Sequence, residues 1–154
     1  MFLQTNDRTI NLRNVSNINI LHASNRIVFN LNYNIEIPNT TCTGTKLISD
    51  YVYWDAVDAH DLKENISRLL VNEYFVKNFM RDSSNNVFVN INEISSIKYS
   101  EKKHRVIFNL SHPVTFRDYD KKERVTSEFV YVNCNSFAHY KEYVNYVKTT
   151  VEGK

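Results

Sequence analysis

Glycine is nearly absent from this chain of 154 residues, which carries only Gly44 and Gly153. Glycine-rich phosphate loops and dinucleotide-binding turns need several positions at which a Cβ atom would keep the backbone away from the phosphate. Two isolated glycines cannot supply those positions. The common kinds of mononucleotide- and dinucleotide-dependent enzyme are therefore excluded.

Cysteine and long apolar segments are scarce as well. Cys42 and Cys134 have no CxxC or CxH spacing and are too few for a disulfide framework, so we expect two reduced thiols in an intracellular protein. The N-terminus lacks the basic start and apolar run of a signal peptide, and no apolar segment reaches 18 residues. The sequence therefore predicts a cytoplasmic protein that does not span a membrane.

The net charge of +2 is too small for the overall basicity typical of many nucleic-acid-binding proteins. The charge is unevenly divided, since residues 78–154 hold 12 Lys and Arg against 9 Asp and Glu. This excess forms two basic segments, which are either solvated hairpins or contacts for phosphate groups. Their basic residues are Lys98, Lys102, Lys103 and Arg105, and then Arg117, Lys121, Lys122 and Arg124.

Residues suited to catalysis or metal binding are scattered. Asp58 and Asp61 fall in the expected first turn of a helix, where carboxylates favour the helix dipole and need no chemical explanation. No histidine has the spacing of a metal site or a catalytic pair. We therefore expect a protein that is not an enzyme and needs neither cofactor nor metal. The histidines are His22, His60, His104, His112 and His139.

The strongest pattern is an internal repeat. Residues 26–31 read RIVFNL and residues 105–110 read RVIFNL, at an offset of 79 residues. The offset holds without a gap on the N-terminal side, and an offset of 78 holds further along the chain. Two copies of one unit are therefore predicted, over residues 1–81 and 82–154, packed as one compact pseudo-dimer. The other matching segments are 10–12 with 89–91, 15–18 with 94–97, and 51–53 with 129–131.

Alternating apolar and polar residues predict four strands and then a helix in each unit. Asn25 is the expected site of positive φ between two strands, and Phe29 and Phe108 should both be buried. The fold class is thus α+β, with two tandem ββββα repeats, antiparallel sheets each packed by a C-terminal helix, and an approximate twofold axis. The expected strands are 9–12, 15–21, 26–37 and 50–54, and then 87–91, 94–99, 104–112 and 126–132.

The first helix should begin after Asp58 and continue to about Met80, and the second should run over residues 137–151 after Ser136. Both preceding residues are good N-caps at matching positions of the repeat. Pro113 lacks an amide hydrogen, so its strand either ends near His112 or contains a bulge.

This order of elements resembles the Whirly and PUR-repeat proteins, which bind single-stranded nucleic acids. The resemblance is carried by residues 51–54 (YVYW) with the helix from Asp58, and by residues 129–132 (FVYV) with the helix from Ser136. It covers nearly the whole chain and implies a fold and a class of ligand.

Strand alternation places aromatic residues opposite the helices. If Val52 and Val130 face the helices, their neighbours share the other face with Arg26, Asn30 and the repeat partners of these residues. Aromatic rings stack on unpaired bases for about 1–3 kcal/mol each. Alternatively, these rings pack against the other repeat. The candidate nucleic-acid contacts are Arg26, Asn30, Tyr51, Tyr53, Lys98, Lys102, Lys103, Arg105, Asn109, Phe129 and Tyr131.

A protein-interaction module is the second functional class that the sequence allows. The 21 Asn residues suggest an AT-rich genome such as that of a virus or phage, whose small proteins bind host factors in the host cytoplasm or assemble with themselves. Apolar residues near the end of the first helix must be covered by the second unit, which we favour, or by another chain of a homo-oligomer. These residues are Leu70, Tyr74, Phe75 and Phe79.

Overall fold

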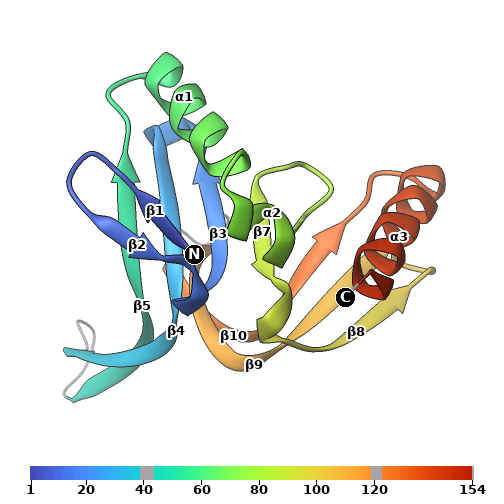
Figure 1. The fold of residues 1–154 in the computed structure, drawn as a ribbon. Coiled ribbons are helices and arrows are strands. Elements are labelled where there is room, and N and C mark those ends of the chain that lie inside the picture. The colour runs from blue at the N-terminus through green and yellow to red at the C-terminus, as the bar shows by residue number, and fades with distance from the viewer. Residues whose placement is uncertain (39–43, 119–122, 154) are drawn as a thin grey trace.

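The computed structural model describes the backbone of residues 1–38, 44–118 and 123–153, and the side chains of residues 1–33, 44–45, 50–113 and 128–153. Within these residues the chain is an α+β protein with three antiparallel sheets and three α-helices, one of them at the C-terminal end (Figure 1).

The N-terminal half contains five strands and two helices. They are β1 (Phe2–Gln4), β2 (Thr9–Asn11), β3 (Val15–Leu21), β4 (Arg26–Pro38), β5 (Thr45–Asp55), α1 (Ala59–Leu70) and α2 (Glu73–Asn78). The C-terminal half contains five strands and one helix. They are β6 (Phe79–Arg81), β7 (Val87–Asn90), β8 (Ile94–Ser100), β9 (Arg105–Asp118), β10 (Glu123–Asn133) and α3 (Phe137–Glu152). Short 3₁₀ turns lie at Leu12–Asn14, His22–Ser24 and Ile91–Glu93.

The strands form sheets of five, three and two strands. The orders are β5-β4-β3-β7-β6, β10-β9-β8 and β1-β2, and every pairing is antiparallel. Figure 1 shows α1 against the five-stranded sheet and α3 against the three-stranded sheet. The first sheet includes strands from both halves, since β7 pairs with β3.

Two hydrophobic cores lie under the helices, and each contains one phenylalanine of the repeated hexapeptide. Phe29 is fully buried in the first and Phe108 is 1% exposed in the second, which confirms the prediction that both are buried. The β6–β7 hairpin contributes to both cores because successive strand residues point to opposite faces. Phe79 and Phe88 belong to the first core, and Met80 and Val89 belong to the second.

Local backbone features recur at the offset of the sequence repeat. Asn25 and His104 both have a φ of 51°, which confirms the left-handed conformation predicted at Asn25. The N-caps also match, because Asp58 Oδ1 accepts from the amide of Asp61 at 2.8 Å and Ser136 Oγ accepts from that of His139 at 3.1 Å. A β-bulge falls near the start of both β3 and β8, where each strand pairs with the next.

The prediction of one long first helix is wrong. The helix α1 ends at Leu70, and Asn72 caps the separate short helix α2 by accepting from the amide of Phe75 at 3.1 Å. Residues Phe79–Arg81 then form β6, in which Met80 pairs with Val89. The apolar residues at helical spacing therefore belong partly to helices and partly to a strand. Residues 79–81 form the strand β6, whose two faces are both buried when it pairs with β7.

The other differences concern strand lengths. The strand β1 was not predicted, and β5, β9 and β10 are longer than expected because two long hairpins continue beyond the cores. Pro113 lies within β9 rather than at its end, and the pairing with β10 is irregular between Asn109 and Val114. The bulge, one of the two outcomes allowed for Pro113, is therefore the one observed.

Candidate nucleic-acid interface

The three-stranded sheet has one face toward α3 and one face away from it. Val130 and Val132 point into the second core, so the alternating residues of β10 point outward. Residues opposite each other in antiparallel strands lie on the same face. The outward face, called here the exposed face, therefore carries Lys98, Arg105, Ile107, Asn109, Phe129 and Tyr131.

Two aromatic rings and one guanidinium group form a row on the exposed face. Phe129 and Tyr131 have ring centroids 4.7 Å apart, and Arg105 lies over the ring of Tyr131 at 4.7 Å. The aromatic side chains are 38% and 46% exposed, which is high for residues of this size. Arg105 is held by a bond from Nε to Asn133 Oδ1 at 2.7 Å. Since this partner is a neutral amide, the positive charge of Arg105 is not compensated by it.

Further polar and basic groups border this row. Asn109 Nδ2 donates to Ser96 Oγ at 3.0 Å. Lys98 is exposed on β8, and Lys102 and Lys103 are exposed in the turn that leads into Arg105. The structure thus brings together seven of the predicted contact residues, all from the C-terminal half.

The same arrangement of two rings and a guanidinium occurs in the N-terminal half, where the guanidinium is paired with a carboxylate. Arg26 lies over the ring of Tyr53 at 4.1 Å, and Tyr51 and Tyr53 have centroids 4.9 Å apart. Here the guanidinium is paired with the carboxylate of Asp55, and this hydrogen bond raises the pKa of Arg26. The ion pair compensates the charge that remains uncompensated at Arg105.

The first-half counterpart of the exposed face is covered. Asn30 is 3% exposed and its strand neighbour Asn17 is 2% exposed, while Tyr51 and Tyr53 are half-buried. The strand β9 lies close to β4 and β5. The structure therefore does not place Asn30 on an accessible surface, and the two sets of predicted contacts do not form one continuous face.

Burial leaves polar atoms of this covered face without partners. Asn17 Oδ1 and Asn30 Nδ2 have no hydrogen bond among the described residues, although their residues are paired across β3 and β4. At the matching positions of the exposed face, Ser96 and Asn109 are bonded to each other. The polar side chains at these matching positions are thus more fully hydrogen-bonded on the exposed face than on the covered one.

Two of the four residues of the predicted interface at the end of the first helix, Phe75 and Phe79, are buried within the chain. Phe75 stacks on Phe79 at 5.2 Å and meets Phe88 edge to face at 5.0 Å, and Phe88 comes from the second half. Tyr74 is half-buried, and Leu70 is 46% exposed.

Two sequence-predicted features lie outside what is described. The side chains of the basic residues from Arg117 to Arg124 lie outside the described residues, and so does Cys42. Cys134 is a free, buried thiol whose pKa is raised by burial.

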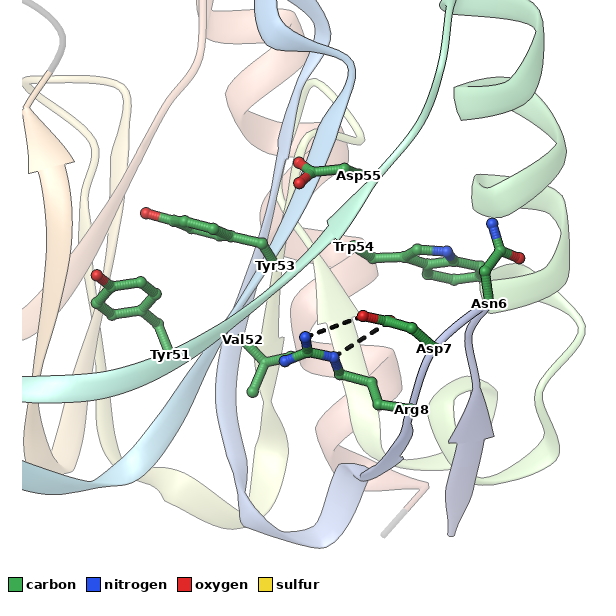
Figure 2. Close-up of a pocket in the computed structure, with 8 residues that line it drawn as sticks. All are labelled: Asn6, Asp7, Arg8, Tyr51, Val52, Tyr53, Trp54 and Asp55. Carbon is green, nitrogen blue, oxygen red and sulfur yellow. Dashed lines mark hydrogen bonds and ion pairs between the residues drawn. The ribbon is translucent and has the colours of Figure 1, made fainter.

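Sequence reasoning missed a pocket of about 340 Å³ between the β1–β2 turn and β5. It is lined by Asn6, Asp7 and Arg8 from the turn and by residues 51–55 from β5 (Figure 2). Asp7 and Arg8 form an ion pair at 3.1 Å, and the hydrogen bond from Arg8 lowers the pKa of Asp7. The strand β1 that positions this turn has only three residues, which is too short for a periodic signal.

One buried donor in the pocket lining has no partner. Trp54 is 2% exposed, and its Nε1 makes no hydrogen bond among the described residues. Figure 2 shows Trp54 extending toward Asn6, while Tyr51 and Tyr53 extend from β5 in another direction, away from the turn.

No group of three or more His, Cys, Asp or Glu side chains that could hold a metal ion occurs in the described part of the chain. Within the same residues, no helix has the length and apolar character needed to cross a membrane. Comparisons with protein-family models, with curated proteins and with solved structures found no match, so the site has to be interpreted from its own geometry.

Proposed function

We propose that the exposed face of the three-stranded sheet binds single-stranded nucleic acid without catalysing a reaction. The observation that carries this proposal is the row of Arg105, Tyr131 and Phe129, in which two exposed rings lie beside a guanidinium that forms no ion pair with any carboxylate among the described residues. Base stacking on aromatic rings and phosphate contacts from basic side chains are the two components of sequence-tolerant single-strand binding.

The charges around the row favour a phosphate backbone as the ligand. Lys98 of β8 lies on the same face as Tyr131 of β10, with Ile107 of β9 between them, and Lys102 and Lys103 lie at the end of the row near Arg105. A strand whose bases stack on Phe129 and Tyr131 would pass its phosphates along these basic groups. The resemblance to Whirly and PUR-repeat proteins supports the same class of ligand, and we place this function inside the cell.

We also propose that the chain is a tandem repeat in which only the second copy binds the ligand. Support comes from the Arg26–Tyr53 and Arg105–Tyr131 contacts at matching positions, and from the paired N-caps and bulges described above. The contacts between the halves are not reciprocal, as an exact twofold axis would require, because β7 pairs with β3 whereas β2 pairs only with β1. We therefore propose duplication without exact twofold symmetry.

The test is fluorescence anisotropy of a labelled oligothymidylate titrated with protein at two or more salt concentrations. Arg105→Ala should weaken binding and reduce the salt slope by about 0.7, the share of one phosphate contact on a single strand. Tyr131→Ala should weaken binding by about 1–3 kcal/mol and leave the slope unchanged, because stacking releases no counterions. Arg26→Ala is the matched control and should leave affinity unchanged, since Arg26 is already paired with Asp55.

The proposal fails if the unmodified protein does not bind the oligonucleotide at low salt, or if Arg26→Ala and Arg105→Ala weaken binding equally. Absence of binding would favour the protein-interaction class instead.

A further inference from the structure

The two small sheets of this protein together contain the counterparts of one complete sheet. The five-stranded sheet has the order β5-β4-β3-β7-β6. At the offset of the repeat, β5, β4, β3 and β7 correspond to β10, β9, β8 and β2. The strand β6 corresponds to β1 through its pairing, because β6 pairs with β7 in the register in which β1 pairs with β2. These five counterparts are divided between a sheet of three and a sheet of two, because β2 does not pair with β8.

The β1–β2 hairpin has the same register as the β6–β7 hairpin. Phe2 pairs with Asn11 and Phe79 pairs with Asn90, and these two asparagines match at the repeat offset. In each hairpin the 3₁₀ turn that follows is capped in the same way, by the side chain of Asn11 or Asn90. The first hairpin is therefore built to add to a sheet edge as the second one does.

The edge strands that would meet are both open. β8 is an outer strand of its sheet, and β2 pairs only with β1 among the described strands. Arg68 and Asn72 bond to the backbone of β1, so β1 lies on the helix side of the hairpin and the other edge of β2 faces away from α1 and α2. An unpaired strand edge is a ready template for another strand.

Apolar side chains are more exposed where this pairing is missing. Phe79 is 6% exposed, whereas its counterpart Phe2 is 56% exposed. Ile18 is fully buried opposite Phe88, whereas its counterpart Ile97 is only half-buried on β8. Both open edges thus carry apolar surface that the intramolecular pairing of β3 with β7 removes from water.

The pocket of Figure 2 lies beside the same hairpin. Its turn residues Asp7 and Arg8 match Asn86 and Val87 at the repeat offset. In the second hairpin, Asn86 forms hydrogen bonds with other residues of the chain. Its carbonyl oxygen accepts from the amide of Ile20 at 2.7 Å, and its side chain bonds to His22 at 2.8 Å. The first hairpin has a vacant groove at this place, with the unpartnered Nε1 of Trp54 in its lining.

We infer that the β1–β2 hairpin of one copy of this chain adds to the β8 edge of a second copy, so that the chains associate head to tail through a five-stranded sheet. The β3–β7 pairing gives the register, in which Ile10 lies opposite Ser96, Thr9 opposite Ile97 and Arg8 opposite Lys98. Such a contact joins different surfaces of the two copies and generates a filament, or a ring if the rotation closes.

The register can be tested by disulfide trapping between separately labelled copies. Arg8→Cys and Lys98→Cys are prepared in chains that carry Cys42→Ser, with the buried Cys134 retained, and the two proteins are mixed and oxidised. A mixed dimer should form about tenfold faster than either homodimer, because opposing residues of antiparallel strands lie within disulfide distance. Arg8→Cys mixed with Lys63→Cys, on the exposed surface of α1, is the matched control.

Three outcomes would overturn the inference. They are a mixed dimer no faster than the control pair, a predominance of Arg8→Cys homodimers, and a link within one chain when both cysteines are on the same copy. Sedimentation gives an independent measurement, in which Phe2→Ser should weaken association about tenfold by removing an exposed ring that the association buries, while Val57→Ser, at a residue that is also exposed, should not change it. Neither assay contains nucleic acid, so their results are independent of the proposed function.

Discussion

Tyr143 links α3 by a hydrogen bond to β6, an outer strand of the five-stranded sheet. It is 2% exposed, and its hydroxyl donates to the carbonyl oxygen of Arg81 at 2.6 Å. The hydroxyl of Tyr146 accepts from the amide of the same residue at 3.1 Å. The hydroxyl groups of two tyrosines therefore bond the backbone amide and carbonyl of Arg81, as a neighbouring strand would at this sheet edge. Tyr143→Phe removes one of these bonds and keeps the packing of the ring.

The expected loss of unfolding free energy follows from the surroundings of the Tyr143 hydroxyl and the Arg81 carbonyl. An intramolecular hydrogen bond contributes about 0.5–1.5 kcal/mol net, and a buried carbonyl left without a partner costs about 1–3 kcal/mol. Arg81 is half-buried, so water can reach its carbonyl in part, and we expect a loss of about 1–2 kcal/mol. For a chain of this size the loss lowers the Tm by about 2–8 °C.

Urea denaturation followed by circular dichroism measures this loss. Tyr140→Phe is the matched control, because Tyr140 is 6% exposed on the same helix and its hydroxyl has no hydrogen bond among the described residues. The control should change the unfolding free energy by less than about 0.5 kcal/mol. Equal losses in both variants, or an unchanged midpoint in Tyr143→Phe, would refute the role given to this hydroxyl.

Three further predictions concern stability. Phe29→Ala and Phe108→Ala should each cost about 3–5 kcal/mol in urea denaturation, and a cost under about 1 kcal/mol at either site would contradict their central place in the cores. Asn25→Ala should cost about 1 kcal/mol while Asn25→Gly is nearly neutral, because only the alanine is strained at positive φ; equal effects in thermal melts would exclude that cause. Burial raises the pKa of Tyr143, so the unfolded chain loses this proton first and the unfolding free energy should fall above about pH 10, by up to about 1.4 kcal/mol per pH unit. Tyr143→Phe should reduce this fall in denaturation curves measured across that range, and an unchanged fall would assign it to other groups.

Much of the fold could be predicted because the sequence repeat gives two separate patterns for many of the elements. The strand starts at Arg26 and Arg105 and the caps at Asp58 and Ser136 depend on local sequence, and the repeat supported each of them independently. The inward direction of Val130 followed from strand alternation alone. These are properties that a short segment determines by itself.

The elements that were missed depend on partners distant in the sequence. Nothing near Phe79 indicates that it leaves the helix for a strand, because that strand exists only through pairing with β7. The burial of Asn30 likewise could not be predicted from its neighbours in sequence, since its strand β4 also lies close to β9, far along the chain. Strand alternation therefore predicted which residues share a face of each sheet, but it could not predict the packing that buries Asn30 in the first half.

The β6–β7 hairpin couples the unfolding of the two halves. Its side chains alternate between the cores, so any fluctuation that releases it removes Phe79 and Phe88 from one core and Met80 and Val89 from the other. Opening at this point exposes apolar surface on both sides at once, which makes independent opening of either half costly. We therefore expect the two halves to unfold as a single cooperative unit, so that slow amide exchange in β3 and β9 should report the same opening free energy.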